Sequence, residues 1–452
     1  MNLPENFISQ MQHLLGVEEY QAFAESLEKE APTAIRLNPH KQLSTETLFG
    51  QELEAVKWNA DGHYLAQRPI FTLDPAFHAG AYYVQEASSM FVAEAIKQTL
   101  DLKQPLKVLD LCAAPGGKTT LLASMLNENS LLVANEVIKS RIAPLKENLE
   151  KWGFPNYIVS NHDPEELIDL EGFFDLVLTD APCSGEGLFR KDPKARNEWS
   201  VDSVQLCSAR QKRILQAAAM LVAPNGYLCY STCTYNEKEN QENAKWLTQT
   251  ADFEEVKLNI PADWQVVEKG MGYQFFPHRT KGEGFYLAVF KKTQGAKTEA
   301  RGKIKFNRLP QRKVELLKKW LEKPENFEFY EKPEGSIVAI PAKLTNEYAT
   351  LFRTLQKRSS GFEIGQFKGE DFIPSHDLAL STAISPKLPA IELSKEDALK
   401  FLKKEHINIE NAQNGWLLTR YQGLNLGFIK VIGDRMNNYL PKEWRIRMDI
   451  PE

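Results

Sequence analysis

The sequence predicts an α/β protein with a doubly wound parallel sheet, and two features of residues 106–290 support this. Short apolar runs alternate with segments of helical periodicity, as in a sheet whose parallel strands are joined by crossover helices. Several runs end at an acidic residue, which is typical of the ligand-binding edge of such a sheet. We expect strands at 106–111, 131–134, 157–160, 174–179 and 227–230, with 285–290 closing the sheet. We expect helices at 138–152, 202–222 and 237–247.

The first strand leads into a glycine turn that is suited to hold a ligand. Asp110 stands near the end of the strand, Pro-Gly-Gly follows at 115–117, and apolar spacing over 121–126 indicates a helix. Glycine lets the backbone approach a ligand closely, and the free N–H groups at a helix start favour an anionic group. The turn is not a P-loop, because Cys112 stands where that motif requires glycine, and the dinucleotide fingerprint G-x-G-x-x-G is absent.

The composition is that of an ordinary globular protein, with 42% hydrophobic and 25% charged residues. Its 452 residues predict about three domains. No apolar run approaches the roughly 18 residues of a membrane span, and no secretory leader opens the sequence, so we expect a cytoplasmic protein without a membrane partner. Five cysteines without a CxxC pair indicate reduced thiols, and the eight histidines have no metal-ligand spacing, so we expect no metal.

Flanking segments extend the predicted sheet domain on both sides. Apolar positions in 4–29 have helical spacing with Gly16 between two helices, and 33–38 is expected to be a strand. A polar linker follows the sheet domain at 293–302. Residues 301–452 hold 26 Lys and Arg against 20 Asp and Glu, a net charge of +6, which is compatible with a polyanionic partner. The expected domains are 1–80, 81–292, 303–370 and 371–452.

Aromatic and basic residues interleave near the end of the sequence. The pattern suits contacts to RNA backbone and bases, and it equally suits core aromatics beside a solvated basic face. The residues concerned are Tyr421, Arg435, Tyr439, Lys442, Trp444, Arg445 and Arg447.

The turn at 110–119, Asp-Leu-Cys-Ala-Ala-Pro-Gly-Gly-Lys-Thr, resembles motif I of the RNA cytosine-5 methyltransferases of the Nop/Sun superfamily. Gln-Glu-Ala-Ser at 85–88 and the segment 277–286 are also similar to motifs of that family. The resemblance implies a Rossmann-like class I methyltransferase domain with a small N-terminal α/β extension and a C-terminal α+β PUA-like RNA-binding region. A short N-terminal extension and a long C-terminal one favour the RsmF type, which acts on 16S rRNA of the small ribosomal subunit, over the RsmB type.

The resemblance implies S-adenosyl-L-methionine as cofactor. Glu136, at the end of the second strand, is placed to accept from ribose hydroxyls, and Asp163 is similar to the family residue near the adenine. Asp180 ends the fourth strand, and we expect Arg141 to face the cofactor as well. The turn supplies the remaining predicted cofactor residues, namely Cys112, Ala113, Ala114, Pro115, Gly116, Gly117 and Lys118.

Two cysteine motifs indicate the chemistry. Asp-Ala-Pro-Cys at 180–183 stands where an amino-group methyltransferase would carry Asn/Asp-Pro-Pro-Tyr/Phe, and Ser-Thr-Cys-Thr follows at 231–234. C5 of cytosine is not nucleophilic until a thiolate adds to C6, and cysteine suits that addition. The residues alone leave Cys183 and Cys233 as candidates. The resemblance to RNA enzymes implies Cys233 as nucleophile, Cys183 assisting release of the adduct, and Asp180 hydrogen-bonding the cytosine at N3.

The expected partner is RNA, namely 16S rRNA or the 30S subunit, and a monomer is the expected state. Arg36 and Asn38 match an R-x-N motif in the N-terminal region of the family, so we expect them on the RNA side, although an exposed strand would also accommodate them. Two alternatives remain open. A tRNA cytosine-5 methyltransferase would share the catalytic residues, and a ribosome-assembly RNA-binding protein could keep the fold without the activity.

Overall fold

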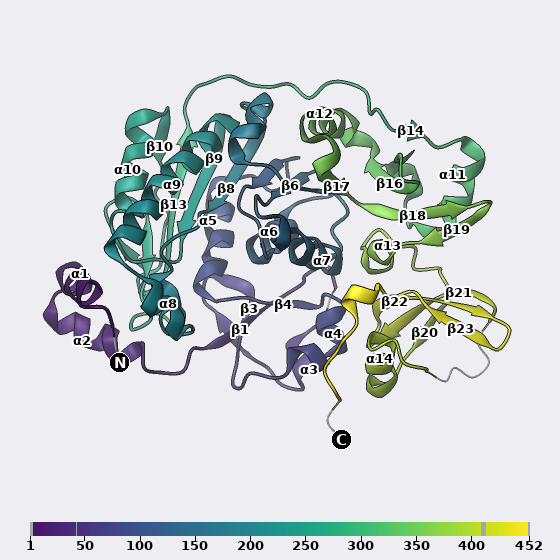
Figure 1. Ribbon diagram of the computed structural model, residues 1–452, viewed down its shortest axis with the longest axis horizontal. Coiled ribbons are helices and arrows are strands. Elements are labelled where there is room, and N and C mark those ends of the chain that lie inside the picture. Colours follow the sequence, from purple (N-terminus) through teal and green to yellow (C-terminus); the bar gives the residue numbers. More distant parts are fainter. Residues whose placement is uncertain (1–2, 42, 408–412, 451–452) are drawn as a thin grey trace.

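A ten-stranded sheet forms the centre of the computed structural model, which describes residues 3–41, 43–407 and 413–450 (Figure 1). Its parallel strands lie in the order β9-β8-β5-β6-β7, so the predicted doubly wound fold is confirmed. The strand order reverses between β5 and β8, which places the expected ligand edge at the carboxyl ends of these two strands. The parallel strands are β5 (Lys107–Asp110), β6 (Leu131–Asn135), β7 (Tyr157–Ser160), β8 (Phe174–Asp180) and β9 (Val222–Thr232).

The sheet extends beyond the strand that was expected to close it. Beside β9 lies β13 in antiparallel orientation, followed by β12 and β11, while β10 also pairs with β13. These added strands have two or three residues each, too few to show an apolar alternation in the sequence. They are β10 (Phe253–Glu255), β11 (Val267–Glu268) and β12 (Tyr273–Phe275), whereas β13 (Phe285–Lys292) is the expected strand and has eight residues.

Helices cover both faces of the sheet. Successive residues of β5 point to opposite sides, so Val108 packs in the core under α5, α6 and α7, whereas Leu109 packs in the core under α9. Burial on both faces explains why the parallel strands are continuous apolar runs in the sequence. The helices are α5 (Phe91–Thr99), α6 (Gly117–Met125), α7 (Ile142–Trp152), α8 (Pro193–Glu198), α9 (Val201–Leu221) and α10 (Gln241–Thr250).

The N-terminal extension combines two helices with a four-stranded antiparallel sheet. Gly16, with a φ of +82°, separates α1 (Glu5–Leu15) from α2 (Val17–Ser26), as the sequence predicted. Phe7 and Phe23 of these helices pack with Phe189 and Trp199 of the sheet domain. The remaining elements are β1 (Thr33–Leu37), α3 (Thr45–Phe49), β2 (Glu54–Val56), β3 (Asn59–Leu65), α4 (Pro75–His78) and β4 (Tyr82–Val84).

A middle module follows a connection that crosses the top of Figure 1. Residues 293–306, all of them described, contain neither helix nor strand, as expected for a linker. The module does not end at 370, because β19 forms a hairpin with β18, and this corrects the predicted boundary. Its elements are β14 (Asn307–Arg308), α11 (Gln311–Leu317), β15 (Phe327–Glu331), β16 (Ser336–Pro341), α12 (Thr345–Leu355), β17 (Ser359–Gly361), β18 (Glu363–Lys368) and β19 (Asp371–Pro374).

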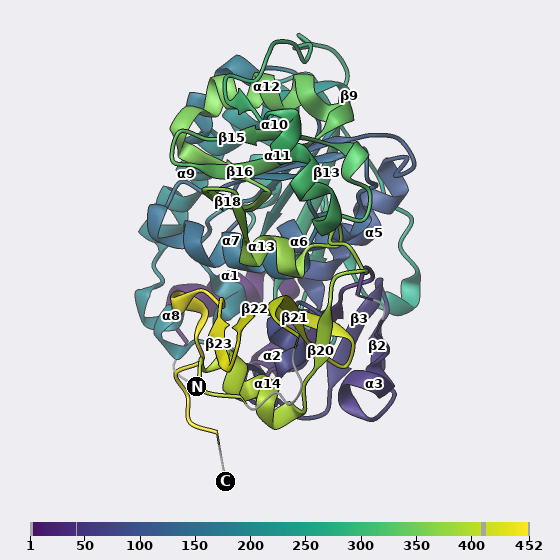
Figure 2. The same cartoon turned by 90° about the vertical axis from the view of Figure 1, so that its right-hand side faces the viewer.

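The middle and C-terminal modules are joined closely to the rest of the protein. Strand β17 leaves its own module and pairs antiparallel with β7, so it becomes an edge strand of the central sheet. The C-terminal sheet lies below the middle module in Figure 2. Phe401 of the adjoining helix shares a core with Tyr82 of the N-terminal sheet. The elements of the C-terminal module are α13 (His376–Leu380), β20 (Ala390–Glu392), α14 (Lys395–Leu402), β21 (Gly415–Tyr421), β22 (Leu424–Ile432) and β23 (Arg435–Asn438).

Candidate active site

The glycine turn between β5 and α6 forms one wall of a cavity of about 200 Å³. Gly116 has a φ of +112°, a left-handed conformation that favours glycine. A Cβ on Gly117 would lie 3.4 Å from the Tyr83 ring, so the backbone of the turn passes close beneath that ring. The cavity is lined by Tyr83, Val84, Gln85, Glu86, Ser89, Asp110, Cys112, Ala113, Ala114, Pro115, Gly117, Lys118 and Asp180.

Asp110 offers this cavity a hydrogen-bond acceptor. The side chain is buried, and its Oδ2 accepts from Thr119 Oγ1 at 2.6 Å. Its Oδ1 has no hydrogen-bond partner among the described residues. Burial raises the pKa of Asp110 to about 7. Because a buried acceptor without a partner is costly, Oδ1 is suited to accept from a ligand amino or hydroxyl group.

The side chains of Glu136 and Arg141 form hydrogen bonds with the backbone of the glycine turn. Glu136 Oε2 accepts from the Ala114 N–H at 3.3 Å, and its Oε1 accepts from the Ile138 N–H at 2.8 Å. Arg141 Nη2 donates to the Ala114 carbonyl at 2.6 Å, and Arg141 Nη1 lies 3.4 Å from Glu136 Oε2. Both side chains therefore fix the backbone of Ala114, and their contact with a cofactor stays a prediction.

Asp163 has other partners in this structure. Its Oδ1 accepts from Arg213 Nη1 at 3.0 Å, its Oδ2 accepts from Arg213 Nη2 at 3.1 Å, and it caps the short helix that begins at Pro164. It is not among the residues that line the 200 Å³ cavity. Asp163 therefore joins this loop to α9, and its place beside an adenine stays a prediction.

Asp180 links the glycine turn to the carboxyl end of β8. Its Oδ2 lies 2.8 Å from Lys118 Nζ, and its Oδ1 accepts from Ser231 Oγ at 2.7 Å. Asp180 and Ser231 face each other in the pairing of β8 with β9. The ammonium of Lys118 also lies 5.1 Å from the centre of the Phe285 ring. Two fixed partners therefore hold the Asp180 carboxylate at the wall of the cavity.

The two predicted cysteines lie together beyond the paired ends of β8 and β9. Cys183 Sγ is 3.1 Å from Cys233 Sγ, both are free thiols, and both are half-buried. The hydrogen bond with Cys233, together with burial, raises the pKa of Cys183 well above its usual value. Cys183 therefore keeps its proton near neutral pH and can donate it to the Cys233 sulfur.

Comparison with known proteins covers nearly the whole chain. Residues 3–87 match the N-terminal domain of 16S rRNA methyltransferase RsmF, 97–291 match 16S rRNA methyltransferase RsmB/F, and 388–446 match the methyltransferase RsmF PUA domain. Ribosomal RNA small subunit methyltransferase F of Vibrio campbellii is 31% identical over 471 residues, which cover 98% of this chain and 97% of that protein. The chain belongs to the RsmF family of 16S rRNA methyltransferases.

Two further similarities agree with the RsmF family. The protein of the same name from Cronobacter sakazakii is 29% identical, over 98% of this chain and 96% of that protein. A methyltransferase homolog protein of Pyrococcus horikoshii has a crystal structure with a TM-score of 0.55 and 29% identity, covering 64% of this chain and 95% of that chain. The recognised family and the predicted Rossmann-like fold class with a C-terminal PUA domain are thus confirmed.

Arg36 and Asn38 of this RsmF-family protein lie in the interior, which corrects the prediction that they face RNA. Arg36 is 1% exposed, and its guanidinium stands 4.3 Å from the centre of the Trp152 ring. It donates to Gln85 Oε1 at 2.8 Å and to Thr120 Oγ1 at 2.6 Å. Asn38 is 2% exposed and donates to the carbonyls of Gly80 and Trp152. Both residues instead fasten the N-terminal sheet to α6 and α7.

Glu86 holds the cavity together, a role that the sequence did not show. Its carboxylate accepts from the N–H groups of Ser88, Ser89 and Glu283, each at 2.8 or 2.9 Å. It thereby ties the segment before α5 to the segment before β13. The family match of Gln-Glu-Ala-Ser at 85–88 was the one available signal, since a lone glutamate in a loop has no pattern of its own.

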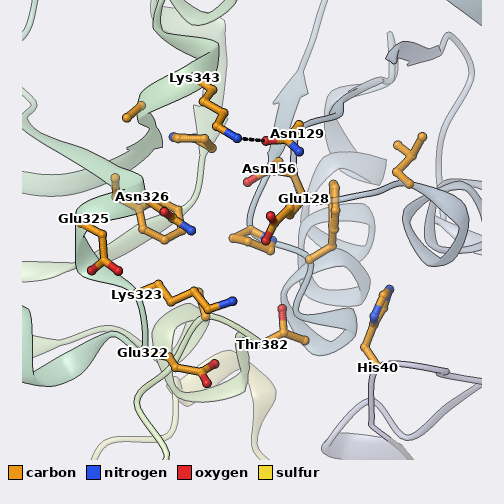
Figure 3. A pocket seen from close by; sticks show the side chains of 17 residues that line it. His40, Glu128, Asn129, Asn156, Glu322, Lys323, Glu325, Asn326, Lys343 and Thr382 are labelled. Carbon is orange, nitrogen blue, oxygen red and sulfur yellow. Dashed lines mark hydrogen bonds between the residues drawn. The ribbon is translucent and has the colours of Figure 1, made fainter. Parts of the chain in front are cut away.

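A second cavity, of about 390 Å³, lies between the RsmF methyltransferase domain and the middle module (Figure 3). Asn129 and Asn156, which line it, precede β6 and β7, so it opens at the edge of the sheet opposite to the glycine turn. Lys343 Nζ crosses the gap to Asn129 Oδ1 at 3.0 Å. Its lining contains none of the predicted site residues, so this cavity is a junction between modules and not the catalytic site.

Within 3–41, 43–407 and 413–450, no three His, Cys, Asp or Glu side chains are grouped so as to hold a metal ion. No helix in those ranges has the length and apolar character needed to cross a membrane.

Proposed function

We propose that this RsmF-family protein methylates C5 of cytosine in 16S rRNA through a covalent bond between Cys233 and C6. The observation that carries the proposal is the pair of free thiols, Cys183 and Cys233, 3.1 Å apart beyond β8 and β9. C5 methylation needs a thiol to activate the ring and a second group to help release it, and methylation of an amino group needs neither. Two adjoining half-buried cysteines beside a carboxylate therefore favour the C5 reaction.

The 200 Å³ cavity fits the proposed cofactor, S-adenosyl-L-methionine. Asp110 Oδ1 has no partner among the described residues and can accept from an amino or hydroxyl group, and the glycine turn leaves the backbone close to a ligand. Gln85, Ser89 and Lys118 add further polar groups to the wall. When bound, the cofactor supplies an electrophilic methyl group.

The residues of the chain have distinct tasks in the proposed reaction. Cys233 Sγ adds to C6, and Asp180, fixed by Lys118 and Ser231, holds the cytosine and stabilises a proton at N3 while the ring gains electron density. C5 is then nucleophilic and accepts the methyl group. Release requires transfer of the C5 proton to water as base and cleavage of the bond between Cys233 and C6, with the electron pair returning to sulfur. The Cys183 thiol assists this step by donating a hydrogen bond to the departing Cys233 sulfur.

The target base has to leave its stack before Cys233 can reach it. Unstacking costs a few kcal/mol and costs least in loops or single strands, so additional RNA-binding surface is needed to offset that cost. The basic residues near the C-terminus are exposed in the structure, whereas Tyr421, Tyr439 and Trp444 are partly buried. We infer that exposed cations of the PUA domain, namely Arg435, Lys442 and Arg445, bind rRNA phosphates together with Arg447, which follows the domain directly.

A methyl-transfer assay tests the proposed function. S-adenosylmethionine with a labelled methyl group is incubated with 30S subunits, naked 16S rRNA or tRNA, and bisulfite treatment then maps the modified cytosines. We expect label at cytosine C5 in 16S rRNA, free or in the subunit. Transfer to tRNA alone would make the protein a tRNA methyltransferase. An absence of transfer to all three substrates would favour a ribosome-assembly RNA-binding protein.

A further inference from the structure

A cleft of about 560 Å³ adjoins the 200 Å³ cavity proposed for the cofactor, and four cations and two carboxylates, Glu30 and Glu86, line it. Val84, Gln85 and Glu86 line both spaces, so the cleft leads from the surface to the glycine turn. Residues 29–34, which follow α2 and include the start of β1, form one side of the cleft. Arg190 and Lys191, which lie between Cys183 and α8, form the other side. The cleft thus passes between the N-terminal extension and the catalytic domain.

Three of the cations that line the cleft are exposed, namely Lys29, Arg68 and Lys191. Lys29 has no ion pair among the described residues, and Lys191 Nζ lies 3.7 Å from Glu283, a long contact. Arg190, in contrast, has a side chain that is only 6% exposed and is held by Glu283 at 3.0 Å and by the Gly282 carbonyl, so it forms the floor of the cleft.

We propose that this cleft binds the single-stranded RNA that flanks the target cytosine, with Lys29, Arg68 and Lys191 on its phosphates. The inference rests on RNA being the substrate, and it replaces Arg36 and Asn38 as the RNA contacts of the N-terminal region. A strand entering here would bring a base toward Asp180, at the wall of the cofactor cavity and at the end of the strand that leads to Cys183. Cations spaced along a groove track a phosphate backbone without reading its sequence.

The affinity for 16S rRNA, measured at several salt concentrations, tests this cleft independently of methyl transfer. Each of Lys29→Gln, Arg68→Gln and Lys191→Gln should weaken binding and reduce the slope of log K against log salt by about 0.7, the value for one lost phosphate contact on a single strand. Lys103→Gln, at an exposed cation before β5, is the matched control and should leave the slope unchanged. Slopes equal to that of the unmodified protein in all three variants would overturn the proposal, whatever the outcome of the methylation assay.

A second and independent observation concerns two buried glutamates beside the cysteines. Glu186 lies three residues after Cys183, and Glu239 lies six residues after Cys233. Both are 0% exposed. Burying a carboxylate is costly unless several donors converge on it, so the donors of each glutamate show what it holds in place.

Glu186 binds the segment that carries the other cysteine. Its Oε2 accepts from Thr234 Oγ1 at 2.6 Å, from the Tyr235 N–H at 2.8 Å and from the Asn236 N–H at 3.0 Å. These three donors follow Cys233 directly in the chain. The backbone of the Cys233 segment is therefore fixed by a carboxylate of the Cys183 segment.

Glu239 makes the reciprocal connection. Its Oε2 accepts from the Ser184 N–H at 3.0 Å and from Gln211 Nε2 at 2.7 Å. Its Oε1 accepts from Ser184 Oγ and, at 2.7 Å, from Asn236 Nδ2. Ser184 is the neighbour of Cys183, so a carboxylate of the Cys233 segment fixes the Cys183 segment.

The segments that carry Cys183 and Cys233 are packed directly against each other, so neither backbone can move independently. The Gly187 N–H donates to the Cys233 carbonyl at 2.8 Å, and a Cβ on Gly187 would also lie 2.8 Å from that oxygen. From the N-terminal extension, Gln10 Nε2 donates to Glu186 Oε1 at 3.0 Å, so α1 supports the same carboxylate.

We propose that Glu186 and Glu239 are positioning residues that set the distance between the two sulfurs for the successive steps of attack and release. The inference rests on the covalent reaction proposed above. Glu186 holds the Cys233 segment, so its loss should slow the attack on C6. Glu239 holds the Cys183 segment, so its loss should slow the release of the adduct. A purely structural role would predict the same effect for both.

The amount of protein–RNA adduct that survives denaturation separates these effects. With 30S subunits and S-adenosylmethionine, Glu239→Gln should accumulate more adduct than the unmodified protein, and Glu186→Gln should form less. Turnover should fall in both variants by about 100-fold, as for a reacting group displaced by about 1 Å. Glu150→Gln, at a buried glutamate of α7 that pairs with Lys146, is the matched control.

Variants that remove a single hydroxyl group test the same contacts if the glutamate variants do not fold. Ser184→Ala and Thr234→Val each remove one hydroxyl donor and should shift the adduct in the same directions as Glu239→Gln and Glu186→Gln, respectively. If Cys183→Ala accumulates adduct but the glutamate and hydroxyl variants all match the unmodified protein, the positioning role is wrong and the proposed function stands. If neither the unmodified protein nor Cys183→Ala forms adduct or methylates RNA, the proposed function fails first.

Discussion

Cys183 Sγ and Cys233 Sγ lie 3.1 Å apart, and the carboxylate of Asp180 stands at the end of the strand that leads to the first of them. If Cys233 attacks and Cys183 assists release, Cys183→Ala should stop the reaction after attack and accumulate a protein–RNA adduct that resists denaturation. Cys233→Ala should abolish adduct and turnover together. Denaturing gel electrophoresis with labelled 16S rRNA measures the adduct.

Cys207→Ala is the control for the cysteine variants. Cys207 is a half-buried thiol on α9, and its replacement should leave adduct and turnover unchanged. The opposite pattern, with adduct accumulating in Cys233→Ala and lost in Cys183→Ala, would exchange the two assignments.

The affinity for S-adenosylmethionine should depend on the ionisation of Asp110. Burial raises its pKa to about 7, so the fraction with a charged carboxylate grows as pH rises from 6 to 8. If the charged form accepts the hydrogen bond from the ligand, the dissociation constant should fall by up to about tenfold across this interval. Calorimetric titration at pH 6, 7 and 8 measures it, and Asp110→Asn should bind more weakly with a flat profile.

A rise in pH should strengthen cofactor binding through Asp110, but it should lower the contribution of Asp110 to folding stability. Its pKa in the folded state lies above the ordinary 3.8, so between about pH 4 and 7 the folded protein binds more protons at Asp110 than the unfolded chain does. The contribution of Asp110 to stability is therefore fully present below that window and is lost as pH rises through it. In the ligand-free protein, Asp110→Asn should gain thermal stability relative to the unmodified protein as pH rises from 5 to 8. An unchanged difference between the two proteins would contradict the assignment.

Asp180 should be needed for turnover far more than for cofactor binding. Asp180→Asn keeps the shape and the contact with Ser231 but gives Lys118 no carboxylate and cannot stabilise a proton at N3. We expect the single-turnover rate to fall by about 100-fold or more, as is usual when a group that assists proton transfer is lost. The dissociation constant for S-adenosylmethionine should change only a few-fold. A rate within twofold of the unmodified protein would rule out this role.

The sequence predicted those elements that are determined by residues close to one another along the chain. Strands buried on both faces are continuous apolar runs, and the turn at 110–119 carries its glycines in sequence, so the central sheet and the cofactor turn could both be predicted. Asp180 and Ser231 could be predicted at strand ends, and the register of β8 with β9 brings them together.

The missed features depend on residues that are distant in the sequence. Strand β17, Ser-Ser-Gly, has no apolar pattern and is a strand because β7 offers it an open edge. Arg36 is buried because Trp152, Gln85 and Thr120 surround it, and an R-x-N motif contains no information about those partners. The contacts of Glu186 and Glu239 likewise arise only when β8 and β9 lie side by side.

The burial of Arg36 predicts a loss of stability without a loss of RNA contact. Arg36→Lys keeps the charge but not the planar fork that reaches Gln85 and Thr120 and lies over Trp152, so buried acceptors lose their donors. We expect the free energy of unfolding to fall by about 3 kcal/mol, measured by urea titration, because unmet buried polar groups carry a cost of that order. Arg312→Lys, at an arginine whose side chain is 80% exposed, should cost almost nothing. The salt dependence of 16S rRNA binding should be the same for Arg36→Lys and the unmodified protein, because a buried guanidinium releases no counterion from a phosphate. A shallower salt slope at unchanged stability would return Arg36 to the RNA interface.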